Sequence, residues 1–213
     1  APAFSPSKRY AKQLLAGLPF EMTGAQKRVS REVAHDMKGN KPMLRLVQGD
    51  VGAGKTLVAG VAACHALEEG WQVALMAPTE ILAEQHYLNF KKWFEPLGLT
   101  VSWLSGKQKG KARTAAEQSI RDCSANLVVG THALFQENVE FAKLGLVIID
   151  EQHRFGVDQR LALRNKGLDG MSPHQLVMTA TPIPRTLAMS AYGDLDTSVI
   201  DELPPGRTPI QTV

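Results

Sequence analysis

Residues 49–56 read Gly-Asp-Val-Gly-Ala-Gly-Lys-Thr, and this stretch limits the possible folds more than any other part of the chain. Its spacing, G-x-x-x-x-G-K-T, is that of a phosphate-binding loop. Its glycines let backbone N–H groups surround a phosphate, and a following helix adds the positive end of its dipole. Lys55 can reach the β and γ phosphates, and Thr56 can offer its hydroxyl to Mg²⁺. The residues expected to bind nucleotide are Gly49, Asp50, Val51, Gly52, Ala53, Gly54, Lys55 and Thr56.

The segments on either side of this loop fit the motif. Residues 43–48 have the composition of a short strand, and residues 57–69 are helix-like and stop at Gly70. A strand, a loop and a helix in that order is the setting that a phosphate-binding loop requires. We therefore expect this part of the chain to be a strand–loop–helix unit.

Short apolar runs alternate with longer amphipathic stretches from residue 44 onward. The runs are residues 44–48, 73–77, 100–104, 127–130, 146–149 and 175–178. This alternation predicts an α/β fold with a mainly parallel sheet buried on both faces by helices. Residues 79–94 are expected to form one of these helices, and Thr23 is a candidate N-cap for another over residues 23–37. We predict an N-terminal extension over 1–22, a nucleotide-binding lobe over 23–200 and a linker over 201–213.

Composition and charge narrow the class of protein only a little. The 213 residues suffice for one α/β domain with a short extension, and the net charge of +3 favours a polyanionic partner weakly. Cys64 and Cys123 have no metal-ligand spacing, so we expect reduced thiols in a cytoplasmic protein. There is no secretory signal and no apolar run that could cross a bilayer. The chain lacks an initiator Met and ends in a strand-like segment, so we expect a piece of a longer protein.

A second part of a nucleotide site is indicated by residues 146–151. Four apolar residues predict a buried strand, and Asp150 and Glu151 follow at its carboxyl end, the edge where open α/β sheets bind ligands. Asp150 is expected to hold Mg²⁺ through its water shell, and Glu151 to orient the attacking water. Taken alone, the two acids could equally be surface carboxylates. The phosphate-binding loop upstream favours the catalytic interpretation.

Several further motifs are similar to those of superfamily 2 helicases and translocases. Residues 150–153, Asp-Glu-Gln-His, resemble the DExH box. The others resemble, in order, the adenine-reading motif (Phe20 with residues 23–26), motif Ia (78–86), motif Ic (129–134) and motif III (179–182). Longer stretches resemble the bacterial RecG family of ATP-dependent DNA helicases: residues 45–52, 74–80, 150–157, 179–189 and 194–207.

The resemblance implies a RecA-like P-loop NTPase domain, the first motor lobe of a double-stranded DNA translocase. Such proteins remodel stalled replication forks and Holliday junctions in DNA repair and recombination. ATP and Mg²⁺ are the implied cofactors. Branched DNA, a second motor lobe and a wedge domain are the implied partners. A lobe without its second half is expected to bind ATP and hydrolyse it weakly.

The resemblance also assigns roles to individual residues. Gln26 and Phe20 are expected to contact adenine. Lys55, Asp150, Glu151 and His153 form the catalytic set, although His153 could also be an ordinary imidazole. The coupling element is Thr179, Ala180, Thr181 and Arg185, and both Arg185 and Arg207 could instead make ordinary salt bridges. The candidate nucleic-acid contacts are Thr79, Glu80, Gln85, His86, Ser105, Gly106, Thr131 and His132.

A basic run at residues 107–113 carries four positive charges in seven residues. It could contact phosphates, and it could equally be the solvated start of a helix. The sequence leaves both interpretations open.

Two other functions compete with the RecG-type lobe. The transcription-repair coupling translocase, which acts with RNA polymerase, shares several motifs but usually has Glu where this chain has Gln152. An ATP-gated nucleic-acid-binding module has no need of Glu151, which argues against that class. A DEAD-class RNA helicase is disfavoured because Gln152-His153 and Thr179-Ala180-Thr181 replace its usual residues.

Overall fold

The computed structural model describes residues 1–49, 54–135, 138–150, 171–180 and 196–201. Within these ranges, seven strands form one sheet in the order β3-β4-β2-β5-β6-β1-β7, and every neighbouring pair is parallel. The strands are β1 (Leu44–Gly49), β2 (Gln72–Met76), β3 (Val101–Leu104), β4 (Leu127–Gly130), β5 (Leu144–Asp150), β6 (His174–Thr179) and β7 (Asp196–Ile200). The predicted α/β fold with a parallel sheet is therefore confirmed.

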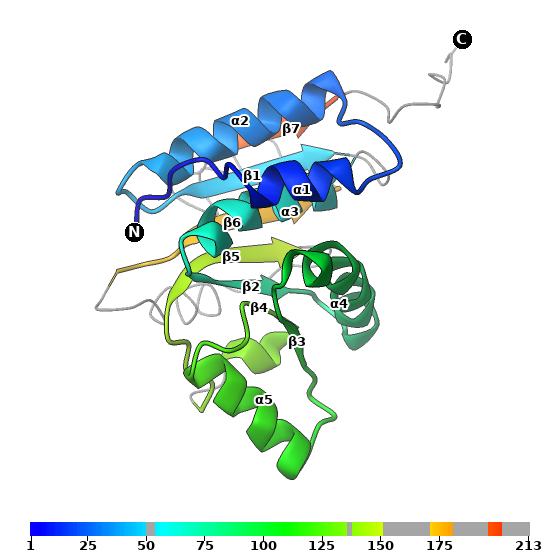
Figure 1. Cartoon of the computed structure of the whole chain (residues 1–213), viewed down its shortest axis with the longest axis vertical. Coiled ribbons are helices and arrows are strands. Elements are labelled where there is room, and N and C mark those ends of the chain that lie inside the picture. The colour runs from blue at the N-terminus through cyan, green and yellow to red at the C-terminus, as the bar shows by residue number, and fades with distance from the viewer. Residues whose placement is uncertain (50–53, 136–137, 151–170, 181–195, 202–213) are drawn as a thin grey trace.

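Helices cover both faces of this sheet. They are α1 (Tyr10–Ala16), α2 (Gly24–Lys38), α3 (Lys55–Glu68), α4 (Glu80–Phe94) and α5 (Lys111–Arg121), with the short 3₁₀ helices η1 (Glu95–Leu97) and η2 (His132–Phe135). In Figure 1, α2 runs alongside β1 and β7, and α5 lies toward β3 at the other end of the sheet. No helix in the described ranges is long and apolar enough to span a membrane.

The sheet separates two apolar cores because successive side chains of a strand point to opposite faces. Val47 of β1 and Ile148 of β5 belong to the core that also contains residues of α1, α2, α3 and α4. Leu46 and Val147, one position away, belong to the core that contains Ile120 of α5. Strands buried on both faces explain why the sequence shows continuous apolar runs rather than alternation.

Side-chain caps fix where two of the helices begin. Thr23 precedes α2 and forms a capping box with Gln26: its hydroxyl accepts from the Gln26 N–H at 3.1 Å, and its own N–H donates to Gln26 Oε1 at 2.8 Å. Thr79 caps α4 by accepting from the Leu82 N–H at 3.2 Å. These bonds satisfy N–H groups that a helix start otherwise leaves without partners. The predicted N-cap role of Thr23 is confirmed.

The first 22 residues, which we expect to precede the lobe, pack onto it. Phe4 and Leu14 are 1% and 3% exposed and belong to the core shared with α2 and α3. His174, at the start of β6, accepts from the Met43 N–H through Nδ1 and donates through Nε2 to the Pro2 carbonyl at 2.6 Å. This segment therefore lies against the amino edge of the sheet. The domain boundary at residue 22 stays a prediction.

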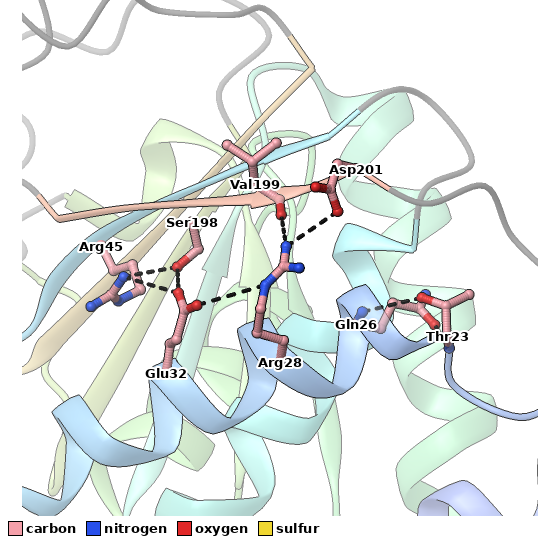
Figure 2. Close-up of polar contacts among 8 residues, drawn as sticks. All are labelled: Thr23, Gln26, Arg28, Glu32, Arg45, Ser198, Val199 and Asp201. Carbon is pink, nitrogen blue, oxygen red and sulfur yellow. Dashed lines mark hydrogen bonds and ion pairs between the residues drawn. The ribbon is translucent and has the colours of Figure 1, made fainter.

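A cluster of polar side chains holds the edge strand β7 to α2 and β1. Arg45 of β1 donates to Asp36 at 2.7 Å and to Ser198 Oγ of β7 at 2.8 Å, and it pairs with Glu32 at 3.4 Å. Figure 2 shows Ser198 donating in turn to Glu32. We call Arg45, Glu32, Asp36 and Ser198 the Arg45 cluster. Arg28 adds a bond from α2 to the Val199 carbonyl at 2.7 Å.

Candidate nucleotide and nucleic-acid site

The two predicted halves of the nucleotide site lie at one edge of the sheet. β6 is the strand between β1 and β5, and its register pairs Thr179 with Gln48 on one side and Met178 with Asp150 on the other. The strand that leads into the phosphate-binding loop and the strand that ends in Asp150 are thus two strand spacings apart, about 10 Å, at the same level. This separation is short enough for a triphosphate and a cation to bridge.

Gly54, the last glycine of the loop, has a left-handed backbone with φ +85° immediately before α3. A Cβ at this position would lie 1.6 Å from the Gln26 side-chain nitrogen. Gln26 is 3% exposed, and its amide oxygen is used by the cap of α2. The start of α2 is therefore packed directly against the loop, at a point where only glycine fits. The expected contact of Gln26 with adenine stays a prediction.

Lys55 and Thr56 open α3, and both are partly exposed. The Lys55 ammonium donates to the Gly49 carbonyl at 2.6 Å, so its side chain folds back over the start of the loop. Phe20, the other residue expected at the adenine, is 47% exposed. Asp50, Val51, Gly52 and Ala53 lie outside the described residues.

Asp150 ends β5 at the same edge. Its Oδ2 lies 2.7 Å from Nε2 of His86 on α4, and the two side chains are only 15% and 12% exposed. Among the described residues no three His, Cys, Asp or Glu side chains converge to hold a metal ion. The predicted Glu151 and His153 lie outside the described residues.

The predicted nucleic-acid contacts occupy the other half of the edge, after β2, β3 and β4. The carboxylate of Glu80, at the start of α4, accepts from Ser105 Oγ at 3.2 Å, the Gly106 N–H at 3.0 Å and Thr131 Oγ1 at 3.3 Å. We call these four residues the Glu80 cluster. It joins three motifs that are far apart in the sequence, and it makes Glu80 an organiser of its neighbours.

The other candidates differ in exposure. Thr79, Gln85 and His132 are exposed, whereas Thr131 is 2% exposed. His86 is directed at Asp150 instead of the open surface. The roles of these residues toward nucleic acid remain predictions.

The basic run divides into two kinds of side chain. Arg113 donates to Glu117 at 2.7 Å and to the Ser105 carbonyl at 3.1 Å, so it supports the loop after β3. Lys107, Lys109 and Lys111 are exposed and form no ion pair within the part of the chain that the structure describes. The three lysines are therefore available to a phosphate backbone.

The coupling element begins on β6, between β5, which ends in Asp150, and β1, which leads into the loop. Thr179 is the last residue of β6, buried between β1 and β5, and Ala180 after it is exposed. Thr181, Arg185 and Arg207 lie outside the described residues.

Sequence reasoning did not find the contact between His86 and Asp150. A signal was available, because His86 lies three residues after Ala83 and four before Phe90, on the stripe of α4 that faces the core. α4 follows β2, which pairs with β5. A polar residue on that stripe, such as His86, therefore lies near the carboxyl end of β5, where Asp150 is.

Comparisons with known proteins agree with this geometry. The profile of the DEAD/DEAH box helicase family matches residues 23–190. The chain is 67% identical to the ATP-dependent DNA helicase RecG of Escherichia coli (strain K12) over 202 residues, which is 94% of this chain and 29% of that protein. It is 55% identical to the RecG of Acidithiobacillus ferridurans, over 100% of this chain and 31% of that protein.

A solved structure of RecG bound to a three-way DNA junction superposes with a TM-score of 0.84 at 45% identity, covering 98% of this chain and 28% of that one. The chain thus spans less than a third of the length of these relatives. The resemblance to RecG expected from the motifs is confirmed. The chain belongs to the DEAD/DEAH box helicase family.

Proposed function

We propose that this chain is the first, ATP-binding motor lobe of an ATP-dependent DNA translocase that remodels branched DNA, such as stalled forks and Holliday junctions. The observation that carries the proposal is the shared edge: Lys55 and Asp150 on one half, the Glu80 cluster on the other. The names of the relatives, which describe an ATP-dependent DNA helicase and its complex with a three-way junction, support the same function.

The residues at the edge fit ATP and Mg²⁺. Gly54 gives the left-handed turn that leads from the loop into α3, Lys55 supplies a positive charge at the start of that helix, and Asp150 supplies an acceptor oxygen. Thr56 and Asp150 would hold Mg²⁺, whose charge would offset the charge that develops on the phosphates. Gln26 and Phe20 would face adenine. Glu151 would orient the attacking water, with His153 relaying the state of the site to Thr179, Ala180, Thr181 and Arg185.

DNA would be held through its backbone, because a translocase must bind every sequence equally. Thr79, Gln85 and His132 are exposed at the correct half of the edge, and the Glu80 cluster orients the Gly106 backbone beside them. Lys107, Lys109 and Lys111 would add positive charge next to this surface. Glu80 itself carries a negative charge, so it would act through the residues that it holds.

We propose further that this lobe hydrolyses ATP slowly on its own. In motors of this type a second lobe supplies arginine side chains to the transition state, and loss of such an arginine costs about 10³–10⁵ in rate. The second lobe and a wedge domain that splits the junction are the partners implied for the longer protein.

The test uses this chain and a chimera in which it replaces the matching segment of Escherichia coli RecG. Lys55→Ala should weaken ATP binding strongly in both. Glu151→Gln should keep ATP binding and stop the DNA-stimulated turnover of the chimera. A chimera in which Lys55→Ala hydrolyses ATP like the parent, or an isolated lobe that turns over tens of ATP per second on branched DNA, would contradict the proposal.

A further inference from the structure

The contact between His86 and Asp150 joins two segments with different expected tasks. Asp150 ends β5 in the nucleotide half of the edge, and His86 lies in the second turn of α4, whose first residue organises the nucleic-acid half. The two residues are 64 positions apart in the sequence and 2.7 Å apart in space. The chain therefore brings them together through tertiary structure.

The surroundings of His86 hold its ring in place. The ring lies 6.3 Å from that of Phe90, one turn later, and Phe90 is fully buried and stacked on Phe94. α4 is itself anchored by its cap at Thr79 and by its packing on β3 and β4. His86 is thus fixed by a rigid helix rather than by a loop, which lets it direct a hydrogen bond accurately.

The direction of the hydrogen bond follows from its partner. A carboxylate only accepts, so the proton lies on Nε2 of His86 and is donated to Oδ2. No described residue donates to the other oxygen, Oδ1. The bond therefore selects one orientation of the carboxylate and leaves Oδ1 without a donor among the described residues.

Groups that hydrogen-bond a metal-binding carboxylate hold it in the orientation that binds the metal, so they contribute to metal affinity and activity. Their loss typically costs about 10–100-fold in metal affinity or activity, because the carboxylate is no longer held ready. His86 stands in this relation to Asp150. It differs from an ordinary supporting residue because it belongs to the helix that begins with Thr79 and Glu80.

We propose that His86 is a positioning residue that orients Asp150 and ties it to α4, so that a shift of α4 on DNA changes the orientation of the acid. The inference rests on the proposed function, because it takes Asp150 as the acid that serves Mg²⁺. It assigns to motif Ia a direct link to the DExH acid, carried by one hydrogen bond.

Two substitutions separate the hydrogen bond from the packing of the ring. His86→Phe keeps a ring against Phe90 and removes the donor. His86→Gln loses the ring and keeps an N–H₂ at a similar distance along the side chain. His86→Ala, which cannot overpack, serves if the Phe ring does not fit. Thermal unfolding of each variant checks that the lobe is folded.

The first readout is the Mg²⁺ concentration at which this chain half-saturates with a fluorescent ATP analogue. We expect it to rise about 10–100-fold in His86→Phe or His86→Ala and to stay near the parent value in His86→Gln. The second readout is the ratio of ATP turnover with and without branched DNA in the chimera. It should fall in the donor-free variants and recover in His86→Gln.

Three outcomes would overturn the proposed role of His86 or part of it. The same Mg²⁺ dependence in all variants would show that His86 only packs. So would a parent-like Mg²⁺ dependence in His86→Phe together with a raised Mg²⁺ requirement in His86→Gln. A raised Mg²⁺ requirement with an unchanged DNA stimulation ratio would overturn the link to α4. If the parent chain binds no ATP at any Mg²⁺ concentration, the proposed function fails and takes this inference with it; a failure confined to His86 leaves the proposed function intact.

Discussion

The side-chain nitrogen of Gln26 occupies the position that a Cβ on Gly54 would need, with only 1.6 Å between them. This contact joins the start of α2 to the phosphate-binding loop. It also makes the glycine at position 54 necessary for two reasons, the left-handed backbone at φ +85° and the absence of space.

Gly54→Ala should therefore lower the free energy of unfolding by more than the strain of a left-handed alanine accounts for. Gly70 is the matched control, because it has φ +80° and a Cβ added there would have nothing within 4 Å. Gly70→Ala should cost about 1–2 kcal/mol of unfolding free energy, the usual cost of a left-handed L-residue. Gly54→Ala should cost more, and this excess should disappear when Gly54→Ala is made in a Gln26→Ala background, which has already lost the capping acceptor of Thr23. Urea unfolding of the parent, the two single glycine variants, Gln26→Ala and the double variant gives these costs, and equal losses in the two single glycine variants would contradict the collision.

Glu80→Ala should destabilise the lobe by about 1–3 kcal/mol, because Ser105 and Thr131 are 5% and 2% exposed and would lose their acceptor. Glu84→Ala on the same helix is the control: Glu84 is exposed, and its loss should stay within about 0.5 kcal/mol. Chemical unfolding of the two variants gives the comparison. A Glu80 variant as stable as the Glu84 variant would mean that the Glu80 cluster contributes nothing to folding.

Replacing Lys107, Lys109 and Lys111 by Gln should flatten the salt dependence of DNA binding by two to three units of log–log slope, about 0.9 for each phosphate that is no longer neutralised. The measurement is a binding titration of the chimera on branched DNA at several salt concentrations. Lys38 and Lys41, exposed just before β1 at the opposite edge, are the control pair, and their loss should leave the slope unchanged. Equal slopes in the triple variant and the parent would make residues 107–113 a solvated helix start.

Acidification should destabilise the lobe through His65. Burial lowers the pKa of this histidine from 6.5 to about 4, and its Nδ1 accepts from the Ser7 N–H. Since the unfolded chain binds the proton more readily, this contribution is complete above pH 6.5 and is lost as the pH falls toward 4. Between pH 7 and pH 5, proton binding to His65 in the unfolded chain should lower the free energy of unfolding by about 2 kcal/mol. His174, whose pKa burial also lowers, adds in the same direction.

Urea unfolding at pH 7 and pH 5 tests this dependence. His65→Gln keeps an acceptor for Ser7 and removes the titration, so its loss of stability over the same interval should be smaller. Parallel behaviour of the parent and the variant would show that His65 does not carry the effect.

Arg45→Met should destabilise the lobe by about 1–3 kcal/mol, because Arg45 is 13% exposed and its loss removes the cation beside the largely buried Asp36 and leaves Glu32 with Arg28 alone. Arg28→Ala removes a guanidinium from the same region, but Arg28 is 46% exposed, so it should cost less than about 1 kcal/mol. Thermal or urea unfolding ranks the two. An Arg28 variant that is less stable than the Arg45 variant would contradict the assignment of the Arg45 cluster as the stronger contact.

The sequence predicted most of the sheet because six of its strands contain a short, mainly apolar run. The runs at 44–48 and 146–149, for example, became β1 and β5, each buried between two neighbouring strands. The sequence did not predict β7, because only alternate residues of this edge strand are buried. Thr197 and Val199 are exposed, and Ser198 and Ile200 are buried. Its signal is a weak alternation of β-branched residues, not a continuous run.

The site was predictable where one local segment fixes the geometry. Residues 49–56 define a loop by themselves, and the sheet register then brings Asp150 to the same edge. Contacts between distant segments were not predictable in this way. The contacts of Glu80 with Ser105, Gly106 and Thr131 depend on how α4 lies on the sheet, and no spacing in the sequence encodes that. For His86, the helical spacing indicates only that the side chain faces the sheet, not that it meets Asp150.

The strand order has a consequence for how the lobe is made. β1, the strand that enters the phosphate-binding loop, lies between β6 and β7, and bonds to these neighbours span 131 and 153 positions of sequence. A ribosome therefore releases β1 long before either neighbour, and both of its edges stay open during that interval. Pairings of such range form slowly, and open apolar edges invite misassembly. The nucleotide-binding strand should therefore be among the last parts of this sheet to complete its pairing during synthesis.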